Sequence, residues 1–104
     1  MADDVLLKNP IAERTYTVDF TALLPGDTTI TALSTVTATS SDGTAVTSVI
    51  GTVSQSGMEL SAVIKAGTAG EDYTITFKGI GTTTGRIETF ILEMRARTSL
   101  SGAV

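Results

Sequence analysis

Threonine alternates with apolar residues along much of this chain, and this pattern limits its fold more than any other feature. The sequence holds 20 Thr and 9 Ser among its 104 residues. Thr is β-branched, which disfavours helix and suits the exposed face of a pleated sheet. In the clearest segments, the apolar positions are Tyr16, Val18 and Phe20, then Met58, Leu60, Ala62, Ile64 and Ala66, then Tyr73, Ile75 and Phe77, and finally Phe90, Leu92, Met94 and Ala96. The period of two predicts half-buried β-strands with all five aromatic residues on core faces.

Turn signals divide the chain into six or seven strands. Leu24-Pro25-Gly26-Asp27 predicts a type II turn, and Ser40-Ser41-Asp42-Gly43 predicts a hairpin. Apolar and β-branched residues predict a strand over residues 28–39, with a bulge or a switch between sheets near Ala32-Leu33. This spacing predicts an all-β fold, an immunoglobulin-like two-sheet sandwich of about seven strands with flexible N- and C-terminal arms. A small barrel is the competing architecture, because alternation does not show whether the sheets close.

The ends of the chain differ in composition from its centre. We expect an N-terminal arm over residues 1–12, a sandwich domain over residues 13–97 and a C-terminal tail over residues 98–104. Pro10 favours an extended chain between arm and domain. The first residues lack the basic segment of a signal peptide, and no apolar run approaches the ~20 residues of a membrane span. The sequence therefore predicts synthesis without an export signal and no membrane contact.

The side-chain inventory excludes much chemistry. The chain has no His, Cys or Trp and a net charge of -4, so a Ser/His triad, a Cys nucleophile and a His/Cys metal site are absent. Seven scattered basic residues argue against nucleic acid. We interpret Asp27, Asp42 and the pair Glu71-Asp72 as turn formers whose side chains bond their own backbone. Calcium in an oxygen-rich loop is a weaker alternative, since no segment repeats acids at alternating positions. We therefore predict no enzyme activity, no catalytic residue, no cofactor and no metal.

Two groups of residues are candidates for contact with a protein partner. Val5-Leu6-Leu7 forms an apolar anchor in the N-terminal arm. Positive charge gathers near the last strand, where two acids alternate with it, and Ile87 interrupts the polar face of that strand. A solvated strand face is the ordinary explanation of this pattern, and contact with an acidic partner surface is the alternative. The predicted partner-binding residues are Val5, Leu6, Leu7, Arg86, Arg95 and Arg97.

Several segments resemble small virion proteins of tailed bacteriophages, the fiber-tail adaptor or head-tail connector-associated group. The resemblance runs from Tyr16 to Arg97, although residues 32–57 align only by strand pattern, and the group more often has Trp where Phe20 stands. The segments that carry it are Tyr16-Thr17-Val18-Asp19-Phe20, Leu24-Pro25-Gly26-Asp27-Thr28, Ala66-Gly67-Thr68-Ala69-Gly70-Glu71-Asp72-Tyr73-Thr74-Ile75-Thr76, Thr82-Thr83-Thr84-Gly85-Arg86 and Arg95-Ala96-Arg97.

The resemblance implies an immunoglobulin-like module present in several copies on a virion, made in the host cytoplasm and without catalysis. Its partners would be other virion proteins of the tail, connector, fiber or capsid. We expect a tail or neck adaptor first. A capsid decoration protein is the alternative within the virion, and a carbohydrate-binding module for host attachment is a second alternative of a different class. With 5 aromatic residues, all expected in the core, sugar stacking is disfavoured.

Overall fold

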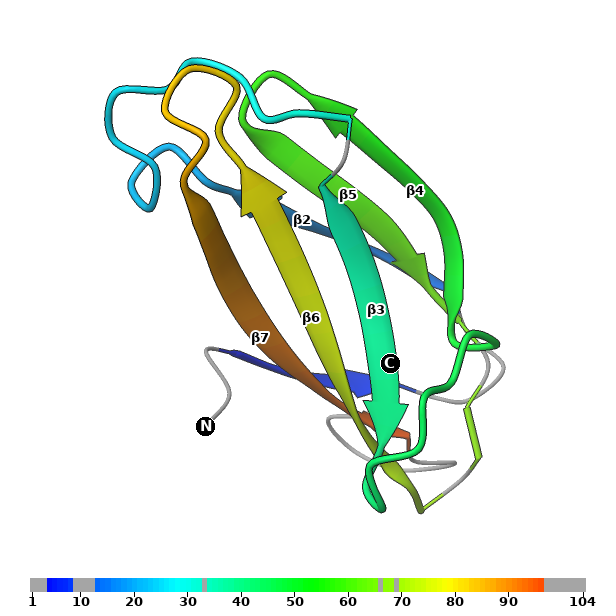
Figure 1. The fold of residues 1–104 in the computed structure, drawn as a ribbon. Coiled ribbons are helices and arrows are strands. Elements are labelled where there is room, and N and C mark those ends of the chain that lie inside the picture. The colour runs from blue at the N-terminus through cyan, green and yellow to red at the C-terminus, as the bar shows by residue number, and fades with distance from the viewer. Residues whose placement is uncertain (1–3, 9–12, 33, 66, 69, 97–104) are drawn as a thin grey trace.

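The computed structural model describes residues 4–8, 13–32, 34–65, 67–68 and 70–96, and these form seven strands without a helix (Figure 1). The strands are β1 (Asp4–Lys8), β2 (Arg14–Asp19), β3 (Thr35–Ser40), β4 (Ile50–Ser56), β5 (Glu59–Ile64), β6 (Asp72–Ile80) and β7 (Ile87–Ala96). Residues 1–3 and 9–12 of the predicted N-terminal arm and the predicted C-terminal tail, 98–104, lie outside the described residues.

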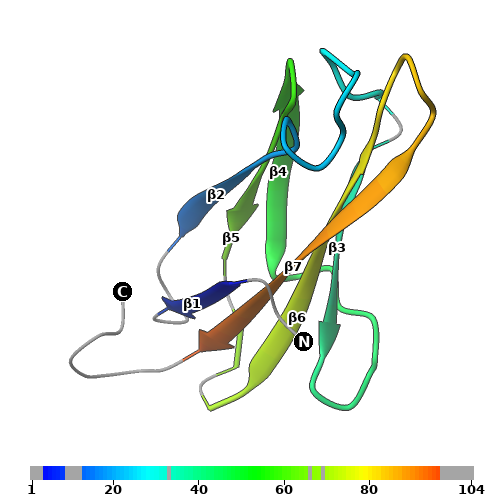
Figure 2. The same cartoon turned by 90° about the vertical axis from the view of Figure 1, so that its left-hand side faces the viewer.

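Two sheets pack face to face, as the side view in Figure 2 shows. One sheet has the order β1-β7-β6-β3 and the other has the order β2-β5-β4. All neighbours are antiparallel except β1, which runs parallel to β7. If β1 to β7 are lettered A to G, the second sheet has the order B-E-D and the first has the order A-G-F-C. These are the two sheets of the immunoglobulin fold, with the first strand placed beside strand G. The prediction of an immunoglobulin-like two-sheet sandwich is therefore confirmed.

Part of the N-terminal arm belongs to the sandwich. Residues 4–8 were expected in a flexible arm, but they form β1 and pair in register with Leu92–Ala96 of β7. Two side-chain contacts add to this pairing: Leu6 packs against the core, and the Tyr16 hydroxyl donates a hydrogen bond to Asp4. The local sequence pattern does not predict this parallel edge strand, because the strand with which it pairs lies more than 80 residues later in the sequence.

The segment before β3 contains less β-strand than the sequence predicted. Residues 28–39 were expected to be largely extended, whereas β3 begins at Thr35 and Ile30 makes only an isolated bridge with Gly81. The Thr31 amide donates to the Ile80 carbonyl, and the Gln55 side chain donates to the Ile30 carbonyl. These contacts hold the segment as a loop over the sandwich end. Of the predicted break near Ala32-Leu33, Leu33 lies outside the described residues.

The core is built from the inner faces of both sheets. Its fully buried large side chains are Phe20, Phe77, Leu24, Leu60, Ile64, Ile75, Leu92, Met94 and Val49. Tyr73 is buried as well, and half-buried Tyr16 and Phe90 pack against this cluster, so the predicted core placement of all five aromatic residues is confirmed.

Phe20 packs closely against Gly79 of the opposite sheet. A Cβ atom added at Gly79 of β6 would lie 2.9 Å from the Phe20 ring, which is closer than real Cβ atoms approach. The Phe20 amide also donates to the Met58 carbonyl at 2.9 Å, and the Leu24 amide donates to the Phe20 carbonyl at 2.8 Å. Phe20 therefore links β6, the β4–β5 turn and the start of the β2–β3 loop.

We predict that Gly79→Ala destabilises the protein by about 1–3 kcal/mol, because the added methyl group overpacks the Phe20 ring. Equilibrium denaturation in urea measures this loss. The double variant Gly79→Ala/Phe20→Leu should lose less than the sum of the two single losses, since the smaller side chain makes room for the methyl. Strictly additive losses would contradict the close contact.

Candidate partner-binding surfaces

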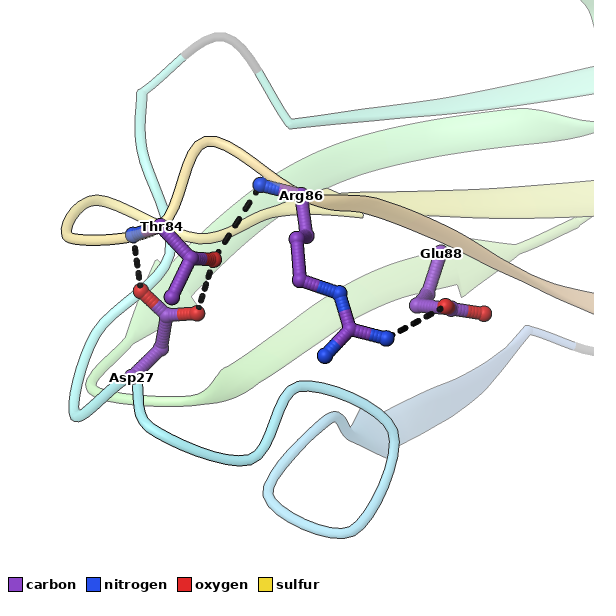
Figure 3. Close-up of polar contacts among 4 residues, drawn as sticks. All are labelled: Asp27, Thr84, Arg86 and Glu88. Atoms are coloured by element: carbon purple, nitrogen blue, oxygen red, sulfur yellow. Dashed lines mark hydrogen bonds and ion pairs between the residues drawn. The ribbon is translucent and has the colours of Figure 1, made fainter.

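One end of the sandwich is rigidified by a buried carboxylate. Asp27 is 7% exposed and lies in the β2–β3 loop, after Gly26, whose φ of 94° fits the predicted type II turn. Its Oδ1 accepts a hydrogen bond from the backbone amide of Thr83 at 2.8 Å. The Thr84 amide donates to Oδ1 at 3.0 Å and the Thr84 hydroxyl donates to Oδ2 at 2.6 Å (Figure 3). The carboxylate therefore clamps the β6–β7 turn to the β2–β3 loop.

The partners of Asp27 differ from those the sequence suggested. We expected each turn Asp to bond its own backbone, and Asp42 does so through the Thr44 amide at 2.9 Å. Asp27 instead bridges to a turn 56 and 57 residues away. A Cβ atom at Gly81 would collide with its carboxylate, so this glycine leaves the space that the carboxylate fills.

The Asp27 contacts favour its ionised form. The hydrogen bond from the Thr84 hydroxyl is the main cause that lowers the pKa of Asp27, with further contributions from the Thr84 and Thr83 amides and from the positive charge of Arg86, against the opposing effect of burial. The hydrogen bonds of the clamp are therefore more favourable while Asp27 is charged.

Arg86 and Glu88 flank Ile87 where β7 begins, next to this clamp. The Arg86 amide donates to the Thr84 hydroxyl at 3.1 Å, which fixes its backbone (Figure 3). Its guanidinium Nη2 lies 3.7 Å from Glu88 Oε2, and the two side chains are 52% and 37% exposed. Ile87 is 57% exposed. Arg86, a predicted site residue, therefore lies at the surface, and the carboxylate of Glu88 partly balances its charge.

The opposite end carries the other predicted residues. Val5, Leu6 and Leu7 all lie in β1, and the register sets Leu7 beside Arg95 of β7. Arg95 Nη2 lies 3.2 Å from Glu93 Oε1, while the Arg95 Nε is buried without a hydrogen-bond partner. The structure therefore brings the apolar anchor and Arg95 together.

The predicted site residues do not form one surface. Arg86 lies immediately before β7 and Arg95 lies near its end, nine positions later, which is about 30 Å at the usual rise of a strand. Arg97 lies outside the described residues. The candidates thus divide between the two ends of the last strand.

A groove that the sequence did not indicate opens between β2 and β7. It has a volume of about 320 Å³ and is lined by Thr17, Val18, Asp19, Leu23, Thr89 and Phe90. Asp19 on its rim accepts hydrogen bonds from the Thr21 hydroxyl and amide, and these lower its pKa. The groove joins residues distant in sequence, so only the pairing of the sheets reveals it.

A second groove lies on the other side of the sandwich, at the β3 edge. Its volume is about 280 Å³, and its lining is Val36, Thr37, Ala38, Ala45, Val46, Thr47 and Ile50. This lining carries no charged side chain. Neither groove therefore combines the acid, base or nucleophile that a hydrolytic site needs.

The described residues include no group of three or more His, Cys, Asp or Glu side chains placed to hold a metal ion. They also include no helix with the length and hydrophobicity needed to cross a membrane.

We predict that Tyr16→Phe loosens β1 while the sandwich stays folded. Removing the hydroxyl deletes the bond to Asp4, but the ring keeps its packing at 5.7 Å from the Phe77 ring centroid. Amide hydrogen exchange in β1 should accelerate about fivefold, the effect of losing about 1 kcal/mol of hydrogen-bond energy. Tyr73→Phe is the matched control, because its hydroxyl accepts from the Thr68 amide instead. Equal rates of amide hydrogen exchange in β1 of all three proteins would show that the Tyr16–Asp4 hydrogen bond does not hold β1 in place.

We predict that Asp27→Asn lowers the melting temperature at neutral pH and reduces the acid sensitivity of the protein. Since folding lowers the pKa of Asp27, its charged form stabilises the folded state above about pH 4, and this contribution disappears as the pH falls through the folded-state pKa. The difference in stability between wild type and variant should therefore shrink below about pH 4.

Thermal melts between neutral pH and acid measure this difference. Asp42 retains some acid sensitivity in both proteins, because the Ser40 hydroxyl lowers its pKa to about 2. Glu13→Gln, which removes an exposed carboxylate outside the clamp, serves as the control. A constant difference at every pH would show that the Asp27 charge does not support the clamp.

A comparison with protein families gives one match that covers most of this chain. The family model for podophage GP4 fiber-tail adaptor protein gp77 matches residues 8–95. No curated protein and no solved structure matches the chain. The matched range extends from the last residue of β1 into the end of β7, so it includes both sheets and the Asp27 clamp. The match confirms the resemblance found in the sequence, and the chain belongs to the podophage fiber-tail adaptor family.

Proposed function

We propose that the chain is a non-enzymatic structural protein of a bacteriophage virion that joins a tail protein to a fiber protein. The family match over residues 8–95 is the observation that carries this proposal. The surfaces agree with it, because neither groove offers the residues of a catalytic site, whereas both ends of the sandwich present ordered loops or strand edges.

An adaptor needs two separate contact surfaces, and the shape of the molecule supplies them. Its principal extents are 43 × 24 × 23 Å, and its long direction separates the β1 end from the Asp27 clamp (Figure 1). We assign Val5, Leu6, Leu7 and Arg95 to the surface for one virion protein, and Arg97, which lies outside the described residues, stays a prediction from the sequence for the same partner. Arg86 belongs to the surface at the other end.

The Asp27 clamp supports a role in holding partners in place. It ties together two loops that would otherwise move independently, so the Arg86 end is ordered before a partner arrives. A pre-ordered surface loses less conformational entropy on binding than a mobile loop does.

Two alternatives make different demands on the structure. A capsid decoration protein would use the same kind of surface but at symmetric positions of the shell. A carbohydrate-binding module requires exposed aromatic rings, whereas Phe20, Tyr73 and Phe77 are buried and Tyr16 and Phe90 pack on the core. The geometry favours protein contact over sugar stacking.

Imaging of intact virions by electron cryomicroscopy tests the proposal. We expect density that fits this sandwich between tail and fiber, in several copies around the tail axis, with β1 toward one neighbour and the Asp27 clamp toward another. Density at the local symmetry axes of the shell would establish decoration instead and would contradict the adaptor assignment.

A further inference from the structure

The outer edge of β7 is only half covered. Strand β1 pairs with Leu92–Ala96, and no other strand of the described residues pairs with the outer side of Ile87–Phe90. This stretch contains Ile87, one of two large apolar side chains that the described part of the chain leaves exposed; the other is Val53 on β4. An uncovered strand edge with an exposed apolar residue is a template for pairing with another strand.

The charges around Ile87 make this edge complementary to itself. Arg86 and Glu88 lie on either side of Ile87, and alternation sets both on the same face. In an antiparallel pair centred on Ile87, Arg86 of each chain stands opposite Glu88 of the other chain, and the two Ile87 residues stand opposite each other. Both are favourable cross-strand pairs.

Other registers are less favourable. An antiparallel pair centred on Glu88 sets the two Glu88 carboxylates opposite each other, and one centred on Arg86 opposes the two guanidinium groups. A parallel pair in register opposes like charges at both positions. Like charges directly opposite are destabilising, so the sequence Arg86-Ile87-Glu88 favours the antiparallel pair centred on Ile87 over these three arrangements.

We propose that this edge of β7 binds a second copy of the chain through a two-fold antiparallel strand pair centred on Ile87. Each contact is made twice, as in an isologous interface. The strand of the second copy would lie on the same edge of β7 as β1, beside the stretch that β1 does not cover. It would leave β1 and Arg95 of both copies exposed to other proteins. Only the place of this pair in the virion rests on the proposed function; the pairing itself rests on the β7 edge.

The oligomeric state of the purified full chain tests the proposal. Sedimentation from micromolar to millimolar protein should show a monomer–dimer equilibrium. Ile87→Lys should raise the dissociation constant by about tenfold or more, because it sets two cations opposite each other in the interface. Val53→Lys makes the same change at an exposed apolar site on the other sheet and should change the constant by less than about twofold.

Charge exchange tests the register. Arg86→Glu and Glu88→Arg, each alone, should weaken the dimer about tenfold, because each sets like charges opposite each other. An equal mixture of the two variants should associate more tightly than either alone, since every acid in one chain then faces a base in the other. The double variant Arg86→Glu/Glu88→Arg should recover the wild-type constant. Melting temperatures of all variants check that they fold.

A monomer at every concentration overturns the proposal, and so does a dimer that Ile87→Lys leaves intact. A mixture no tighter than its components overturns the register. Because these measurements use one purified chain, they leave the adaptor role, which virion imaging tests, unaffected.

Discussion

The packing of Phe20 against Gly79 is the contact on which the rest of the structure depends. Phe20 follows directly after the last residue of β2, and its carbonyl accepts hydrogen bonds from the Leu23 and Leu24 amides. The loop that follows is therefore anchored to the core before it reaches Asp27. Because Asp27 in turn holds the Thr83 and Thr84 amides, the packing of one aromatic ring positions both loops at this end of the molecule.

The parts of the fold that follow from the sequence are those set by local patterns. Alternation places β5, β6 and β7 within a few residues of their observed bounds, and Pro25-Gly26 predicts a turn whose φ angle agrees. The parts that do not follow depend on distant partners. The pairing of β1 with β7, the bonds of Asp27 and the groove beside Phe90 each join residues that no local window contains.

The candidate site shows the same division. The sequence identified Arg86 and Arg95 as surface charges, and both are partly exposed beside a carboxylate two residues away. Local patterning did not indicate that β1 covers one half of the β7 edge and leaves the other half uncovered. That fact comes from the strand order, which sets Arg95 beside β1 and leaves Arg86 outside this pairing.

The central proposal is that the two opposite ends of this sandwich bind different virion proteins. Cross-linking of intact virions through lysine, followed by mass spectrometry, tests this most directly, because Lys8 ends β1 and Lys78 lies in β6 toward the other end. The account predicts that Lys8 cross-links to one virion protein and that Lys78 cross-links to a different one. Links from both lysines to the major shell protein alone would contradict it.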